Sequence, residues 1–251
     1  MKLARPLIIL IGLLLLWQAI VIVSRAPAYI LPGPMAVIEA WISRPELFLE
    51  HGAITMAEIL LGLFFGLILG ISSALVMAYF RPAREWLLPV LVISQAIPVF
   101  ALAPILVLWF GYGMASKVIM ATLIIYFPVT AAFHDGLRRT EPGWVELART
   151  MNGSRWSILR HVRIPAALPA LGSGLRVATA VAPIGAIVGE WVGSSSGLGY
   201  LMLHANARMQ IDVMFAALGT LAVLAVALYF IIDFAVRHSI KWQPDSHPNE
   251  P

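Results

Sequence analysis

The chain has 251 residues, of which 60% are hydrophobic and only 12% are charged. Soluble domains average about 45–50% apolar and about 25% charged residues, so this composition excludes an ordinary soluble protein and predicts an all-α protein that crosses a membrane repeatedly. The net charge of +4 is assigned to basic cytoplasmic loops rather than to a nucleic-acid surface, and the absence of cysteine excludes disulfides and thiol chemistry.

Six apolar segments are long enough to cross a bilayer, which takes about 20 mainly apolar residues in a helix. The predicted spans are 6–24, 54–80, 87–110, 116–134, 170–191 and 213–236. The first is longer than the core of a signal peptide, about 7–15 residues, so we expect it to be retained. Because no hydrophilic stretch is long enough for a second domain, residues 1–251 are predicted to form a single transmembrane domain.

The basic residues give the predicted orientation, because cytoplasmic loops carry an excess of lysine and arginine. With both termini in the cytoplasm, twelve Lys and Arg face inward and only four face outward, namely Arg25, Arg44, Lys117 and Arg208. Residues 24–53 and 200–212 then lie outside. The first of these segments contains the turn sequence LPGP and is expected to form a short interfacial helix over 35–43.

Glycines recur at every fourth position in two of the spans: Gly62, Gly66 and Gly70 in one, and Gly185, Gly189 and Gly193 in the other. In lipid, small residues at this spacing let helix backbones approach closely. We interpret both stripes as packing surfaces rather than as ligand contacts.

Polar residues inside spans are candidates for function, because they are costly in lipid. Gln95 with Pro98 is the strongest candidate for a pore-lining position, since a proline frees a backbone carbonyl that must then face protein or water. Glu58, Arg176 and Glu190 are further candidates. For Glu58 we favour a carboxylate that reaches the outer interface. For Arg176 and Glu190, an interfacial or ion-paired role stays open beside a role in the path.

The segment 135–169 is polar and rich in arginine although it separates two spans, so we expect it to form a folded element in the cytoplasm. Its first helix is predicted to start with Thr140 as the N-cap. The helix is predicted to end at Asn152-Gly153, because these residue types accept the left-handed backbone that closes many helices.

A second helix is expected to follow the bend, with Ser154 as its N-cap. Pro165 is predicted to end this helix and Pro169 to open the next span. An amphipathic connector lying among lipid headgroups would explain the tryptophans and arginines of the segment. It would not explain the order of glutamate, bend and prolines.

This loop resembles the EAA signature of the membrane subunits of bacterial ABC importers. The opening E-A-A is matched by 146–148 and the apolar-x-apolar-Pro close by 162–165, at the family's spacing. Asn152 stands where the family has glycine, and Gly153 follows it directly. The resemblance assigns coupling to the partner ATPase to Glu146, Leu147, Ala148, Met151, Asn152, Gly153, Val162, Ile164 and Pro165.

The resemblance extends over most of the chain from the second span onward. Segments 98–111 and 185–201 are similar to permeases of the nitrate, sulfonate and taurine type, and residues 190–210 look closest to permeases for thiamine-precursor pyrimidines. The resemblance therefore implies import of a small polar solute, with a thiamine-precursor pyrimidine as the favoured class. Sulfonate, taurine or nitrate-type anions are the alternative.

The same resemblance implies a type I ABC importer transmembrane domain in a bacterial inner membrane, with 135–169 as its coupling loop. It implies a homodimer, two cytoplasmic ABC ATPase subunits and an external solute-binding protein as partners, besides membrane lipid. ATP and Mg²⁺ would bind to the ATPase, and this subunit would hold no cofactor or metal and catalyse no reaction. In agreement, the sequence has no G-x-x-x-x-G-K-[ST] phosphate loop.

Three other classes of membrane protein have different sequence signatures. A secondary transporter would show inverted repeats and paired charges near the middle of the membrane, and the sequence has no convincing repeat. A membrane enzyme would need clustered acid, base or metal-binding residues. The coupling subunit of an energy-coupling-factor importer carries Ala-Arg-Gly motifs, whereas this chain has one Ala-Arg-Thr at 148–150.

Overall fold

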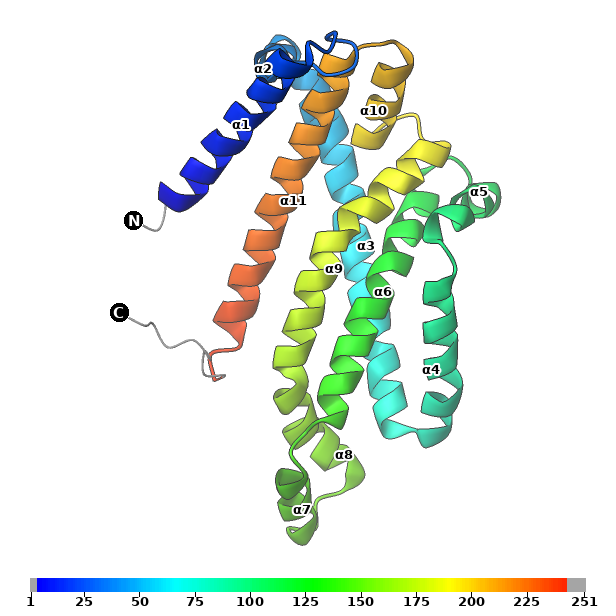
Figure 1. Ribbon diagram of the computed structural model, residues 1–251. Helices are drawn as coiled ribbons and strands as arrows, with labels where there is room; N and C mark the ends of the chain where they lie inside the picture. The colour runs from blue at the N-terminus through cyan, green and yellow to red at the C-terminus, as the bar shows by residue number, and fades with distance from the viewer. Residues whose placement is uncertain (1–3, 243–251) are drawn as a thin grey trace.

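The computed structural model describes residues 4–242, which form an all-helical bundle (Figure 1). The first six helices are α1 (Ala4–Ser24), α2 (Pro34–Ser43), α3 (Pro45–Tyr79), α4 (Arg81–Ala96), α5 (Val99–Phe110) and α6 (Met114–Arg138). They are followed by α7 (Pro142–Thr150), α8 (Arg155–Ile158), a π-helical turn (Leu159–Arg163), α9 (Ile164–Gly193), α10 (Leu198–Ala207) and α11 (Ile211–Ser239).

Within residues 4–242, four helices are long and apolar enough to cross a membrane on their own: α3, α6, α11 and the continuous helix Arg155–Gly193. The pair α4 and α5 qualifies as a fifth crossing only when the two are taken together. In α1, the part that counts as apolar helix, Ile11–Ser24, falls below that length. About six spans were expected, and the described residues form four or five elements of membrane length.

The third predicted span, 87–110, is a broken helix, because the chain bends by 100° between α4 and α5. Ile97 has an extended backbone and Pro98 is the N-cap of α5. A residue before proline is driven out of the helical conformation by its clash with the proline ring. This steric effect favours the extended backbone of Ile97, but it does not break a helix by itself, since Pro89 and Pro104 lie inside their helices.

The core lies where α3, α6 and α9 pack together. The glycine stripe of α3 faces α6 closely: a Cβ at Gly62 would meet Ala121 Cβ at 2.5 Å, and one at Gly66 would meet Ile125 Cγ2 at 2.5 Å. The stripe of α9 packs against α6 as well: a Cβ at Gly185 would lie 2.7 Å from the Ala121 backbone. The two glycine stripes are therefore packing surfaces, as predicted from their spacing.

We expect Gly66→Ala to destabilise the folded protein by about 1–3 kcal/mol, because the added methyl group overlaps a branched side chain of α6. The matched control is Gly219→Ala in α11, where a Cβ would meet nothing within 4 Å. The melting temperature of each variant in detergent is measured by monitoring the loss of monodisperse protein on heating. Equal melting temperatures for the two variants would contradict the packing of α3 on α6.

The bundle has two distinct ends (Figure 1): α7 and α8 lie at one, and α2, α5 and α10 at the other. The helix α1 leans away from the bundle. It is joined to α11 by the stacked rings of Trp17 and Phe215, whose centroids are 5.7 Å apart. The expected interfacial helix is present as α2, where Trp41 Nε1 donates to Thr220 Oγ1 at 3.0 Å.

Candidate functional site

The segment 135–169 folds into a helical hairpin whose bend is at Asn152, as predicted. Asn152 has a φ of +58°, in the left-handed region that asparagine and glycine accept best. The Gly153 N–H donates to the Ala148 carbonyl oxygen at 2.9 Å, closing the end of α7. A Cβ at Gly153 would lie 2.7 Å from that same oxygen. The positive φ thus belongs to Asn152, while Gly153 is required for its small size.

These two positions give opposite predictions. Asn152→Gly should leave transport nearly unchanged, because glycine adopts a positive φ freely. Gly153→Val should strongly reduce transport, because its side chain would push the bend away from α7. Solute uptake by cells that express equal amounts of each variant is the measurement. A large loss for Asn152→Gly would mean that the asparagine side chain has a specific role.

The helix boundaries of the hairpin agree only partly with the prediction. Ser154 caps α8, since its Oγ accepts from the Ser157 N–H at 3.1 Å. Thr140 does not cap α7: its hydroxyl donates to the Leu137 carbonyl at 3.3 Å, and the N-cap is Glu141.

The predicted helix end at Pro165 and the predicted start of a new span at Pro169 are wrong, because one helix runs from Arg155 to Gly193. The π-helical turn 159–163 directly precedes the first of these prolines. A wider turn tolerates the missing N–H and the bulk of a proline ring. The second helix of the hairpin and the following span are therefore one continuous helix.

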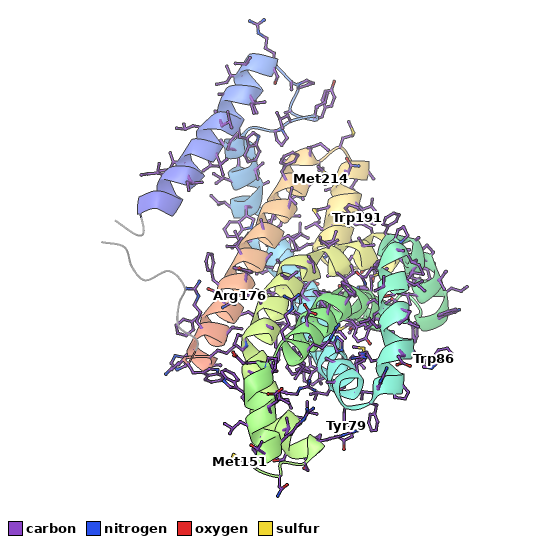
Figure 2. The ribbon with its side chains drawn as sticks, turned by 60° about the horizontal axis from the view of Figure 1, so that its bottom comes forward. Tyr79, Trp86, Met151, Arg176, Trp191 and Met214 are labelled. Carbon is purple, nitrogen blue, oxygen red and sulfur yellow. The ribbon has the colours of Figure 1, made fainter. Side chains whose placement is uncertain are left out.

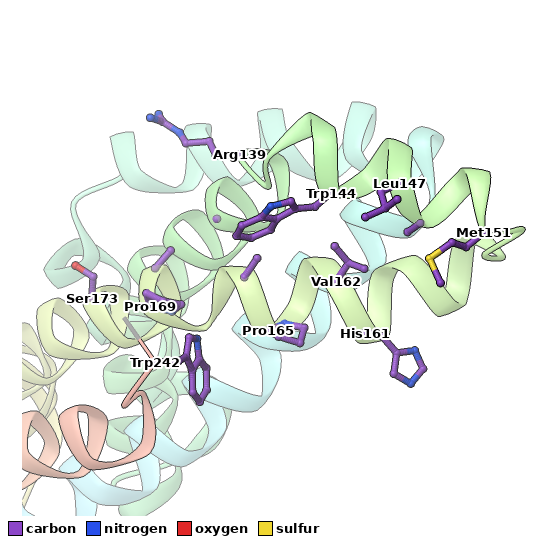
Figure 3. Close-up of a pocket in the computed structure, with 14 residues that line it drawn as sticks. Arg139, Trp144, Leu147, Met151, His161, Val162, Pro165, Pro169, Ser173 and Trp242 are labelled. Carbon is purple, nitrogen blue, oxygen red and sulfur yellow. The ribbon is translucent and has the colours of Figure 1, made fainter. Parts of the chain in front are cut away.

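A groove of about 1020 Å³ separates α7 from the start of α9 (Figure 3). Its α7 wall is formed by apolar side chains that are largely exposed, with Trp144 at 56%, Leu147 at 62% and Met151 at 76% of their full accessibility. Figure 3 shows Leu147 and Met151 opposite Val162 on the facing helix, and Trp144 extending along the groove. Exposed apolar surface of this kind marks an interaction site when it is contiguous.

Most of the residues assigned to coupling meet at this groove, which is lined by Leu147, Ala148, Met151, Val162 and Pro165. Glu146 does not line it. Two residues before Ala148 it points to the far side of α7, since a helix turns about 100° per residue. Ile164 packs instead against the bundle core beside Phe133 and Leu137.

Trp144 and Trp242 also line the groove, and sequence reasoning did not assign them to it. The spacing of 144, 147, 148 and 151 marks one face of a helix and could have identified Trp144. The position of Trp242 depends on how α11 returns to the inner end, which no local pattern encodes.

A second group of functional candidates is buried beside the start of α10, at the end of the bundle opposite α7 and α8, which we take as the outer end. Lys117 Nζ donates to Glu58 Oε1 at 2.8 Å, and both side chains are almost inaccessible. The interfacial role favoured for Glu58 is therefore wrong. Because α3 begins at Pro45, Glu58 lies roughly three and a half turns inside it. Lys117 likewise is not an outward-facing basic residue but an internal cation of α6.

Glu190 of α9 belongs to the same cluster. Its Oε1 accepts from Thr55 Oγ1 at 2.6 Å, and its Oε2 accepts from the Gly199 N–H. Thr55 Oγ1 also accepts from the Leu198 N–H at 2.8 Å, and His51 Nδ1 accepts from the Gly197 N–H at 2.9 Å.

The N–H groups at the start of α10 are thus satisfied by side chains of α3 and α9 rather than by a local cap. A helix start buried without such partners would be unstable. The glycines at 197 and 199 let the backbone approach Glu190 this closely, because a Cβ at either position would collide with its carboxylate.

The remaining candidates lie elsewhere. Figure 2 shows Arg176 between α9 and α11, where its Nε donates to Asp233 Oδ1 at 2.6 Å, so it is ion-paired. Arg237 Nε approaches the other oxygen of Asp233 at 2.9 Å. Gln95 precedes the break between α4 and α5 and lines a cavity of about 160 Å³ together with Tyr126. The polar candidates of the spans therefore fall into three separate places.

The described residues contain no group of three or more His, Cys, Asp or Glu side chains that could hold a metal ion.

The chain is similar to proteins of known class. Residues 62–242 match the family model described as the binding-protein-dependent transport system inner membrane component. A probable ABC transporter permease protein of Haemophilus influenzae is 56% identical over 95% of this chain and 98% of its own length. The formylaminopyrimidine transport permease protein ThiX of Halalkalibacterium halodurans is 36% identical over 95% of this chain and 96% of its own length. The riboflavin transport system permease protein RibX of Chloroflexus aurantiacus is 37% identical, with 92% and 87% covered.

Among solved structures, an inward-facing form of the MetNI methionine ABC transporter has the same fold, with a TM-score of 0.68 over 78% of this chain and 97% of that chain, at 22% identity. Family model, relatives and fold agree. The chain therefore belongs to the inner membrane components of binding-protein-dependent transport systems: it is the non-catalytic, multi-pass permease subunit of an ABC importer.

Proposed function

We propose that two copies of this subunit form the translocation path of a type I ABC importer, with two ATPase subunits in the cytoplasm and a solute-binding protein outside. The segment 135–169 is the coupling loop within a single transmembrane domain, and both chain termini face the cytoplasm. The observation that carries this proposal is the exposed apolar face of α7 at the water-facing end of the bundle.

The partner that covers the groove face of α7 is the ATPase, and the hairpin fits a cleft in it. Leu147 and Met151 are too exposed to contribute to the stability of an isolated chain, so their burial requires a partner. Ala148 is the small residue between them, which lets a partner surface approach the helix backbone. A short amphipathic helix seated in a cleft is a common mode of recognition, in which a few apolar anchors supply most of the affinity.

Coupling uses the continuous helix that starts in the hairpin. Its 39 residues, Arg155–Gly193, span about 58 Å at about 1.5 Å per residue. A displacement of the hairpin by the ATPase is therefore transmitted along a rigid element to the outer end of the bundle. ATP binds the two global states with different affinity and thereby shifts their populations.

The translocation path is assigned to the break between α4 and α5, where Gln95 and Pro98 lie. Irregular backbone at membrane depth is tolerated where it lines a cavity, and the small cavity beside Gln95 fits this requirement. Arg176, Glu58 and Glu190 contribute to the stability of the bundle, because each is bonded to a partner within the chain.

A thiamine-precursor pyrimidine is the favoured substrate. The formylaminopyrimidine permease relative supports this class, and a pyrimidine needs hydrogen bonds rather than a counter-charge. Lys117 and Arg176, the cations that the structure describes deep within the spans, are both bonded to carboxylates. Neither is free to balance a sulfonate, taurine or nitrate-type anion, so the anion alternative is less well supported.

Reconstitution tests the transport mechanism. Proteoliposomes that contain this permease and its ATPase, supplied with the external binding protein, should take up solute only with internal Mg-ATP. Uptake should persist when ionophores collapse the ion gradients. Uptake that follows an ion gradient without ATP would identify a secondary transporter instead.

The substrate is tested on the binding protein. Mass spectrometry of the small molecule that co-purifies with it should identify an aminopyrimidine. Competition of labelled uptake by unlabelled aminopyrimidine, taurine and riboflavin then ranks the classes. Competition by taurine alone would support the anion alternative.

A further inference from the structure

The buried cluster at the outer end contains two acids and one base. Glu58, Glu190 and Lys117 have exposed fractions of 0%, 1% and 3%. The two carboxyl groups lie within hydrogen-bonding reach of each other, and Lys117 bonds to Glu58. With both acids ionised, the cluster would carry one uncompensated negative charge away from water. Such a buried charge is strongly disfavoured, and proteins avoid it by neutralising the group.

The hydrogen bonds show which carboxyl oxygen can carry the neutralising proton. Both oxygens of Glu190 receive donors, from Thr55 Oγ1 and from the Gly199 N–H. Oε1 of Glu58 accepts a hydrogen bond from the Lys117 ammonium. The buried Oε2 of Glu58 accepts none from any donor among the described residues. An oxygen that lacks a donor and lies beside another carboxylate is satisfied if it carries a proton itself.

We propose that the outer cluster is a proton-binding site, in which Glu58 Oε2 carries one proton and donates it to the Glu190 carboxylate. With Lys117 charged, the cluster is then electrically neutral and each buried oxygen of the two acids has a hydrogen bond. The ligand is a single proton per chain.

The neighbouring ionisable groups do not change the net charge of the cluster. His51 of α3 accepts a hydrogen bond at Nδ1 from the Gly197 N–H, so its imidazole is neutral. Tyr200 of α10 stacks on His51, and His204 of α10 packs against Tyr200.

The proton has a structural consequence for the outer end. Glu190 is bonded to the first turn of α10, and Thr55 links the same turn to α3. Without the proton, two adjacent carboxylates would repel each other at this anchor. The bound proton therefore holds the loop 194–197 and α10 onto the bundle.

Infrared spectroscopy of the full-length chain in lipid nanodiscs tests the proposal directly. With ¹³C-labelled glutamate, the wild-type protein should show the carbonyl stretch of a protonated glutamic acid at pH 7. This band should disappear in Glu58→Gln. Asp233→Asn is the matched control and should retain it, since Asp233 faces two arginines. Absence of the band from the wild type, or its persistence in Glu58→Gln, would overturn the proposal.

Stability provides a second, independent measurement. A glutamine at 58 imitates the protonated acid: its amide donates to Glu190 while its oxygen accepts from Lys117. The apparent melting temperature of Glu58→Gln should therefore match that of the wild type, whereas Glu58→Ala should melt several degrees lower. A Glu58→Gln protein that melts as low as Glu58→Ala, or that does not fold, would mean that Glu58 is ionised.

Discussion

Ala148→Trp abolishes ATP-dependent uptake while the subunit still inserts into the membrane and keeps its melting temperature; this is the result we expect. Ala148 lies between exposed apolar residues on the groove face of α7, so an indole there blocks the approach of the ATPase without disturbing the core. Loss of a central contact in an interface costs at least about 2 kcal/mol, or about thirty-fold in affinity. Co-purification with the ATPase and uptake in proteoliposomes measure the effect.

The matched control is Arg149→Trp, which adds the same ring to the neighbouring position. Arg149 is exposed and does not line the groove, because a shift of one residue turns the side chain by about 100°. It should retain the ATPase and most of the uptake. If Ala148→Trp co-purifies with the ATPase as well as Arg149→Trp does, the groove is not the docking site.

Lys117→Met is expected to have the largest effect on folding. It removes the cation that bonds Glu58 while leaving the acids of the cluster buried. With Glu58 protonated, loss of Lys117 leaves the buried Glu190 carboxylate without a counter-ion, and an uncompensated buried charge of this kind costs about 3–5 kcal/mol, a large part of the stability of a typical domain. We therefore expect little folded protein in the membrane fraction, measured by detergent extraction followed by size-exclusion chromatography with fluorescence detection.

An exposed ion pair provides the comparison. Arg139 Nη2 lies 2.9 Å from Asp135 Oδ2, and both side chains are accessible. Arg139→Met removes a cation in the same way, but water solvates the remaining carboxylate, so the yield should stay near that of the wild type. Equal yields for Lys117→Met and Arg139→Met would show that Lys117 is not essential to the bundle.

The helices could be predicted from the sequence wherever an apolar run or a local stereochemical signal defined them. The bend at Asn152 and the glycine stripes are set by neighbours along the chain or along one helix face, so they were found. The long start of α3 was missed because its first turns carry polar residues such as Glu46 and His51. The break in the third span falls at Pro98, the proline that the sequence singled out together with Gln95, but no local signal showed that Pro89 and Pro104 would stay inside their helices.

The buried cluster was beyond sequence reasoning. Glu58 and Lys117 are 59 residues apart, and Thr55 and Glu190 are 135 apart. Each residue alone has an ordinary explanation as an interfacial charge near the end of a span. Only the close packing of α3, α6 and α9 brings them together. The groove was partly predictable, because its α7 face is a local helical pattern.

The capping of α10 by other helices has a consequence for biogenesis. An isolated helix of ten residues is marginal on its own, and this one has no local cap at Gly197. Its first turn depends on Thr55 and Glu190, which leave the ribosome earlier. The outer segment should therefore acquire its structure only after α3 and α9 have associated in the bilayer, which makes it a late step of assembly.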